Sequence, residues 1–118
     1  MQGALDMDID VTVNGRELPG TNTLKAQAYG RICRVLKRFP GTADRVTVTV
    51  SDRGSHVYQC RIQLWVDGVV VMVVQVEHVD PVTGVDRAAD RVRRNLARIR
   101  QRALEISDRS TSGRSDLR

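Results

Sequence analysis

Alternation of apolar and polar residues predicts most of the β-structure in this chain. The segments 8–13, 45–52 and 56–66 each place aliphatic side chains on one face and polar side chains on the other, which is the period of a half-buried strand. The segment 69–77 is a nearly continuous valine run of strand length. The sequence therefore predicts four β-strands.

Two other segments repeat their apolar residues at intervals of three and four, the period of an amphipathic helix. The first spans 22–39, where Thr21 or Asn22 can cap the start and a Pro-Gly pair ends the helix. The second spans 83–106, and its apolar stripe comprises Val85, Ala88, Ala89, Val92, Leu96, Ile99, Ala103 and Ile106. We expect this helix to be about 33 Å long, at about 1.5 Å per residue.

The connections between these elements predict how the strands pair. Asp67-Gly68 is a preferred two-residue hairpin turn and 53–55 is a similarly short loop, so the last three strands should form an antiparallel meander. The helix between the first two strands allows a right-handed crossover and a parallel pair. The sequence thus predicts an α+β fold of order β-α-β-β-β-α, a two-layer sandwich with two helices on one face of a four-stranded mixed sheet.

Composition limits the chain to one domain with an aliphatic core. Its 118 residues are 41% hydrophobic but only 3% aromatic, so valine, leucine and isoleucine must supply the packing. We expect a single domain over 1–106. The segment 107–118 is almost entirely polar, and we expect it to be a disordered tail.

Residues that would indicate catalysis or metal binding are isolated from one another. Cys33 and Cys60 lack a CxxC spacing, and His56 and His78 have no metal-ligating neighbours in the sequence. The chain contains no GxGxxG, phosphate-loop or GxSxG motif. We therefore expect no metal, no cofactor and no small-molecule substrate, and a binding protein rather than an enzyme.

Nothing in the sequence indicates a membrane protein. The longest apolar run, within 69–76, is far shorter than the roughly eighteen residues of a membrane-spanning helix. The N-terminal MQGALDMDID carries acids where a signal or transit peptide carries basic residues. We expect a cytoplasmic protein with no membrane partner.

Positive charge is concentrated in the two predicted helices. The first carries five basic residues and no acid, and the second carries seven arginines and three acids, although the net charge of the whole chain is only +5. At about 100° per residue, five arginines fall within roughly 80° along the second helix, beside its apolar stripe. We call them the arginine ridge: Arg87, Arg91, Arg94, Arg98 and Arg102. Arg31, Arg34 and Arg38 form a similar row on the first helix.

Such rows have more than one interpretation. Long arginine side chains also solvate ordinary helices and cover apolar flanks. The ridge, however, has few acids to pair with, and an anionic partner would relieve its self-repulsion. Arginine is also the better phosphate ligand because its fork is planar and weakly hydrated. Charge alone therefore favours nucleic acid over a membrane surface. Trp65 lies opposite the core face of its strand and either stacks a base, covers the open sheet face or contacts a partner.

The order of these elements and several short segments resemble a known family. These segments are VTVNG, the basic helix LKAQAYGRICRVLKRF, the valine meander and, most specifically, VDPVTGVDRAADRVRRNLARIRQR. Over about residues 8 to 104 the chain resembles the short form of the ribosome hibernation-promoting factor and ribosome-associated translation inhibitor family. Asp80, Asp86 and Asp90 stand where that family's helix pattern has acids.

The resemblance implies a function and a set of sites. Members of the family are ribosome stasis factors that bind the small ribosomal subunit near the decoding region, contact ribosomal RNA and occlude tRNA and mRNA. It implies a monomer when off the ribosome. Together with the ridge, it predicts RNA-binding roles for Arg31, Arg34, Arg38, Arg87, Arg91, Arg94, Arg98, Arg100 and Arg102. Arg93 and Arg100 lie off the ridge.

Two other functions fit the same pattern of residues. A free-standing double-stranded RNA-binding protein can have the same outline of two helices on one sheet face. A protein-interaction module could instead use the arginine ridge to dock an acidic partner. Comparable affinity for plain RNA duplexes would indicate the first, and binding that survives nuclease treatment would indicate the second.

Overall fold

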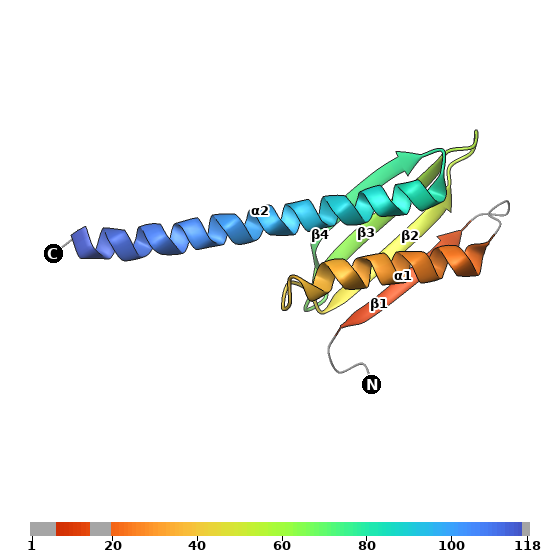
Figure 1. Ribbon diagram of the computed structural model, residues 1–118. Helices are drawn as coiled ribbons and strands as arrows, with labels where there is room; N and C mark the ends of the chain where they lie inside the picture. Colours follow the sequence, from red (N-terminus) through yellow and green to blue (C-terminus); the bar gives the residue numbers. More distant parts are fainter. Residues whose placement is uncertain (1–6, 15–19, 117–118) are drawn as a thin grey trace.

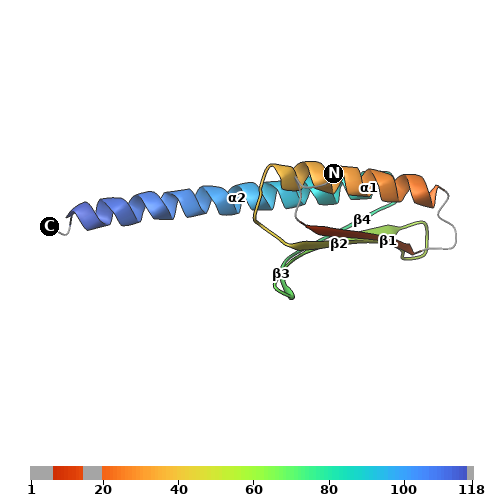
Figure 2. The same cartoon turned by 90° about the horizontal axis from the view of Figure 1, so that it is seen from below.

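The computed structural model describes residues 7–14 and 20–116, with side chains described up to 106. One four-stranded sheet carries both helices on the same face (Figures 1 and 2). Along the chain the elements are β1 (Asp8–Asn14), α1 (Thr21–Lys37), β2 (Arg45–Asp52), β3 (Tyr58–Val66), β4 (Val69–His78) and α2 (Pro81–Asp116). The predicted α+β fold and its element order are confirmed.

The strands lie in the order β1-β2-β3-β4. β1 and β2 are parallel and are joined across α1, whereas β2, β3 and β4 form the expected antiparallel meander. One row of aliphatic residues crosses the sheet through all four strands, from Val11 to Val48, Ile62 and Val74. The alternation seen in the sequence therefore sets which face of every strand meets the helices.

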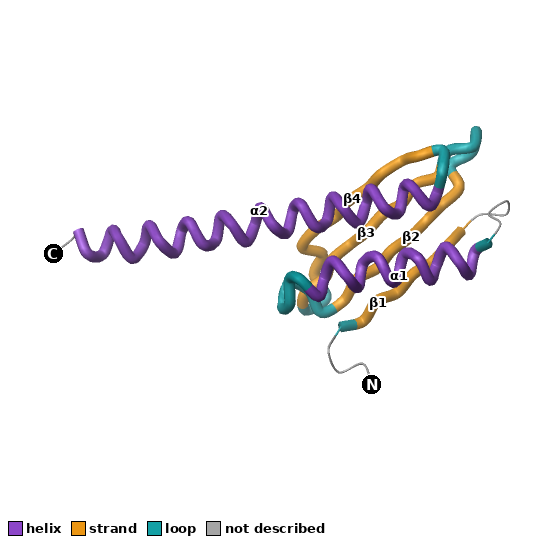
Figure 3. Tube along the Cα trace, viewed as in Figure 1, coloured by secondary structure: helices purple, strands orange, loops and turns teal. Residues whose placement is uncertain are grey.

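The core lies between this face of the sheet and the helices. α1 lies over β1, and α2 lies over β3 and β4 (Figure 3). The apolar stripe of α1 is buried, as are the predicted stripe residues of α2 up to Leu96. Beyond that point the prediction is wrong, because α2 leaves the sheet and Ile99 and Ile106 are each 55% exposed.

Both helices begin at residues other than those predicted. α2 starts at Pro81 rather than near Thr83, because proline at the first helical position needs no hydrogen bond for its missing N–H. The carboxylate of Asp80 accepts a hydrogen bond from the Thr83 hydroxyl at 2.6 Å. α1 starts at Thr21 with Gly20 as its N-cap, at φ 67°, and without a side-chain cap hydrogen bond.

The C-terminal end of α2 also differs from the prediction. Its backbone is helical to Asp116, past the predicted end at 106. The side chains of 107–118 and the backbone of 117–118 lie outside the described residues. The disordered tail predicted for this segment therefore stays a prediction.

The face of the sheet away from the helices carries Trp65, whose side chain is half-buried. Its indole N–H donates a hydrogen bond to Thr47 Oγ1 at 3.2 Å, and the Arg45 guanidinium lies 5.6 Å from the ring centroid. Thr47 in turn donates to Gln63 Oε1 at 3.1 Å. These contacts hold the indole ring against the open face of the sheet, and the role of Trp65 in binding stays a prediction.

The β3–β4 hairpin turns at Asp67 and Gly68, both with positive φ, as expected for a two-residue turn. A β-bulge between Leu64 and Trp65 interrupts the pairing just before this turn. Bulges bend the strand that carries them, and Figure 2 shows the end of this hairpin turning away from the helix layer.

Exchanging single glycines for alanine should have opposite effects in the hairpin and in α1. Gly68 has φ 78°, and a side chain in this left-handed region costs about 1–2 kcal/mol. Gly30 lies inside α1, where alanine should raise the free energy of unfolding by about 0.5–1 kcal/mol. An added Cβ meets nothing within 4 Å at either position, so backbone conformation alone should set the sign. Urea unfolding measures both variants, and a loss of stability in Gly30→Ala would contradict this account.

Candidate nucleic-acid interface

The arginine ridge lies along the side of α2 that faces β4. Arg87, Arg91 and Arg94 line a groove whose other wall is formed by Gln75 and Glu77. Arg91 Nη1 also donates to the carbonyl oxygen of Gln75 at 3.3 Å. This half of the ridge therefore flanks the edge of the sheet.

The other two residues of the ridge line a separate hollow. Arg98 and Arg102 lie beside Val71 and Met72 of β4, where α2 begins to leave the sheet. Both arginines are exposed. The ridge predicted from the sequence is thus continuous along α2, but its first three arginines lie beside Gln75 and Glu77 and its last two beside Val71 and Met72.

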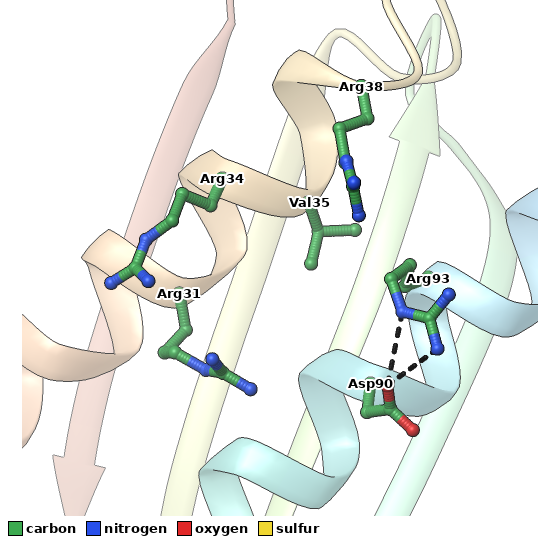
Figure 4. Close-up of a pocket in the computed structure, with 6 residues that line it drawn as sticks. All are labelled: Arg31, Arg34, Val35, Arg38, Asp90 and Arg93. Carbon is green, nitrogen blue, oxygen red and sulfur yellow. Dashed lines mark hydrogen bonds and ion pairs between the residues drawn. The ribbon is translucent and has the colours of Figure 1, made fainter.

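A second basic groove lies between the two helices. Arg31, Arg34 and Arg38 of α1 line it together with Arg93 of α2 (Figure 4). This places the arginine row of α1 opposite Arg93 and not opposite the ridge. The structure therefore brings the predicted α1 residues together with a residue that the sequence had left out.

Arg93 was missed because the sequence does not show which side of α2 meets α1. On a helical wheel Arg93, Arg100 and Asp86 fall on one side of the apolar stripe, and the ridge falls on the other side. Only the packing of the helices shows that the first side faces α1. The sequence does place Arg93 beside the apolar stripe of α2. This position indicates a site residue only when α1 is known to pack on that side.

Two aspartates separate the basic groove from the ridge. Asp90 Oδ1 accepts hydrogen bonds from Arg93 Nη2 at 2.9 Å and Nε at 3.1 Å (Figure 4), and its Oδ2 lies 3.0 Å from Arg94 Nε. Asp86 Oδ1 lies 3.1 Å from Arg31 Nε, an ion pair without hydrogen-bond alignment, and accepts a hydrogen bond from Gln27 Nε2 at 3.2 Å. Each carboxylate thus holds guanidinium groups on the outer side of the helix layer.

These contacts favour the ionised form of Asp90. The hydrogen bond from Arg93, followed by the charges of Arg93 and Arg94, holds the pKa of Asp90 below its ordinary value. The hydrogen bond from Thr83, followed by backbone N–H groups at the start of α2, lowers the pKa of Asp80. Asp90 therefore partly neutralises Arg93 and Arg94, and among the described side chains the arginines further along α2 form no ion pair with an acid.

Arg100 has a different environment from the other predicted sites. Its guanidinium lies 4.5 Å from the ring centroid of Phe39 and donates from Nη1 to the carbonyl oxygen of Arg38 at 3.2 Å. A cation at the C-terminal end of α1 satisfies a free carbonyl and complements the helix dipole. Arg100 therefore fastens α2 to the end of α1, although its side chain remains exposed.

The described part of the chain shows no metal site, no disulfide and no membrane-spanning helix. Within residues 7–14 and 20–116, no three His, Cys, Asp or Glu side chains lie together where a metal could bind. Burial raises the pKa of the Cys60 thiol to about 12, so it stays protonated, and both cysteines are free thiols. In the same part of the chain, no helix is long and apolar enough to cross a bilayer.

A protein family and two solved structures are similar to this chain. A family model described as "Sigma 54 modulation protein / S30EA ribosomal protein" matches residues 11–103. The N-terminal domain of Protein Y from Thermus thermophilus is 24% identical, with a TM-score of 0.62 over 79% of this chain and 99% of that chain. A ribosomal subunit interface protein from Coxiella burnetii is 15% identical, with a TM-score of 0.61 over 80% of this chain and 99% of that chain. No curated protein matches the chain. At these identities the two structures show a shared fold.

Proposed function

Because the chain belongs to the family of the sigma 54 modulation protein / S30EA ribosomal protein, we propose that it is a ribosome-associated stasis factor. It binds the small ribosomal subunit near the decoding region and contacts ribosomal RNA through α1 and α2. Its bulk then occupies space that tRNA and mRNA require, so it inhibits translation by occupancy and without catalysis. This activity would place it in the cytoplasm, and we propose that it is monomeric when free.

The observation that carries this proposal is the distribution of arginines on the outer side of the helix layer. The groove between the helices and the arginine ridge together present nine arginines, four on one side of Asp86 and Asp90 and five on the other. Planar guanidinium groups bind phosphate oxygens in pairs. Two parallel rows of such groups suit a folded RNA, whose phosphates approach from more than one strand.

The fold supports binding by a rigid surface. α1 and α2 are fixed to the sheet through a shared aliphatic core, and Arg100 joins α2 to the end of α1. The arginines of the α1 row, and those of the ridge up to Arg98, are therefore held at a set spacing before any RNA arrives. Preorganisation of this kind lowers the entropy lost on binding.

Sedimentation with purified ribosomal subunits tests the proposal. We expect the protein to pellet with small subunits and not with large ones, and binding to weaken as salt is raised. With five or more phosphates engaged, log affinity should fall with log salt at a slope of about −3.5 or steeper, from roughly −0.7 to −0.9 per contact.

The same experiment distinguishes the alternatives. Equal affinity for a plain RNA duplex and for small subunits would show a free-standing double-stranded RNA-binding protein instead. Binding that persists after nuclease treatment and ignores RNA competitors would show a module for an acidic protein. Absence of the protein from every ribosomal fraction of starved cells would overturn the proposal.

A further inference from the structure

A hollow opens where α2 leaves the sheet beside the β3–β4 hairpin. Val71 and Met72 of β4 line one side, and Asn95, Arg98, Ile99 and Arg102 of α2 line the other. The bulge opposite Leu64 and Trp65, where Val71 is the extra residue of β4, bends the hairpin away from the helices, while α2 continues past the sheet (Figures 1 and 2). We call this hollow the notch.

The notch has exposed aliphatic side chains on both of its sides. Val71 and Ile99 are each 55% exposed although they lie on opposite sides of the same hollow, and Val69 on the same hairpin is 62% exposed. Single exposed valines are ordinary on protein surfaces, but apolar residues gathered around one concave site indicate a binding surface. Aliphatic side chains neither stack on bases nor bind phosphates, so RNA gains little here. The notch fits a protein segment.

The backbone of β4 offers a second means of holding such a segment. β4 is an edge strand that pairs only with β3 in the described sheet. Edge strands usually carry charges that discourage pairing with another chain, yet residues 69–73 are four valines and a methionine. An extended segment can add to such an edge through main-chain hydrogen bonds.

The charge at the rim of the notch selects the kind of segment. Arg98 and Arg102 lie one turn apart, and among the described side chains neither forms an ion pair with an acid. Arg98 donates from Nη2 to the neutral Asn95 at 3.3 Å. A second copy of this chain seated symmetrically would bring another Arg98 and Arg102 to the same place. Complementary charge therefore requires an acidic occupant.

We propose that the notch docks an acidic segment of a partner protein, with one or two aliphatic side chains buried between Val71 and Ile99. The carboxylates of the segment pair with Arg98 and Arg102. This interaction goes beyond RNA binding but shares Arg98 and Arg102 with the proposed RNA contacts, whereas Val71 and Ile99 are not RNA contacts. The acidic segment therefore competes with RNA for these two arginines and docks when the protein is off the ribosome.

Titration of ¹⁵N-labelled protein with a short capped peptide tests the docking. The probe is a run of glutamates with two central leucines, compared with versions in which lysine replaces glutamate or serine replaces leucine. We expect saturable chemical-shift changes at residues 69–73 and 98–102 with the first peptide. Loss of the leucines should weaken binding at least about tenfold, and the lysine version should not bind.

Two pairs of variants locate the binding. Val71→Ser with Ile99→Ser should lose peptide binding at least about tenfold. Val79→Ser with Val82→Ser removes two other exposed valines, 67% and 41% exposed, and should bind as the parent does. Small-subunit binding should stay unchanged in both pairs, so failure of this proposal is distinguishable from failure of the proposed function.

Three results would overturn the proposal. Equal peptide binding by both variant pairs would show that the notch is not the site. Shift changes spread over every arginine, and independent of the leucines, would show attraction by charge alone. Concentration-dependent shifts at 69–73 without peptide would show that a second copy of the chain occupies the notch.

Discussion

Exchanging both Arg94 and Arg98 for glutamate is expected to weaken binding to the small ribosomal subunit by at least about a hundredfold, since each lost charge-assisted hydrogen bond costs about 1.5–3 kcal/mol. Both residues lie on the ridge, away from the buried stripe of α2. The fold should persist, because a glutamate at 94 only replaces the ion pair with Asp90 by a like-charge contact worth about 0.2–0.5 kcal/mol. Sedimentation measures binding, and circular dichroism measures folding.

The open face of the sheet provides a control with the same change in net charge. Arg45 and Arg61 are exposed there, one over Trp65 and the other hydrogen-bonded to Gln75. Arg45→Glu with Arg61→Glu should reduce binding far less than the ridge variant, because these residues lie opposite the helix layer. Equal losses in the two double variants would show that overall charge, and not the ridge, determines affinity.

Truncating Leu36 to alanine is expected to lower the free energy of unfolding by about 2–5 kcal/mol. Leu36 lies near the end of α1 with 0% of its surface exposed, in the core shared with the sheet. Removing its branched end leaves a cavity that its aliphatic neighbours cannot fully close. Because α1 would be less firmly held, the arginines that line the groove between the helices should also be held less firmly in position. Urea unfolding followed by circular dichroism measures the change.

Leu104 on α2 is the matched control for this truncation. It is 58% exposed, and leucine and alanine have similar helix propensities. Leu104→Ala should therefore change the free energy of unfolding by less than about 0.5 kcal/mol. A similar loss in both variants would show that the core is not where the structure places it.

The fold could be predicted from the sequence because local and long-range patterns agree in this chain. The alternation in β2 places Val46, Val48 and Val50 on one face, and all three are buried. The Asp67-Gly68 pair similarly sets the β3–β4 turn. The ends of the helices were harder to predict because they depend on single residues. Pro81 can start a helix or break one, and its position after Asp80 decides between the two.

The arrangement of the site was only partly predictable. Helical periodicity was enough to place the five arginines of the ridge on one side of α2, since that depends on the helix alone. The position of Arg93 opposite α1 depends on how two helices pack, which periodicity does not specify. The contact of Arg100 with Phe39 likewise joins residues from different elements. Contacts between elements were therefore the part that required a structure.

Because α2 projects past the sheet, ligand binding to its arginines should cost different amounts of entropy over the sheet and beyond it. Up to Leu96 the helix is held by the core, whereas residues 98–106 are all exposed. Arg100 still contacts the end of α1, but a helical stretch without buried side chains is marginal in water, so we expect the helix beyond Arg100 to fray. A ligand that binds Arg102 must also order the helix beneath it, with unfavourable entropy and favourable enthalpy. Contacts to Arg87 and Arg91 do not have this entropy cost. The same guanidinium group should therefore contribute less net affinity toward the C-terminal end of α2.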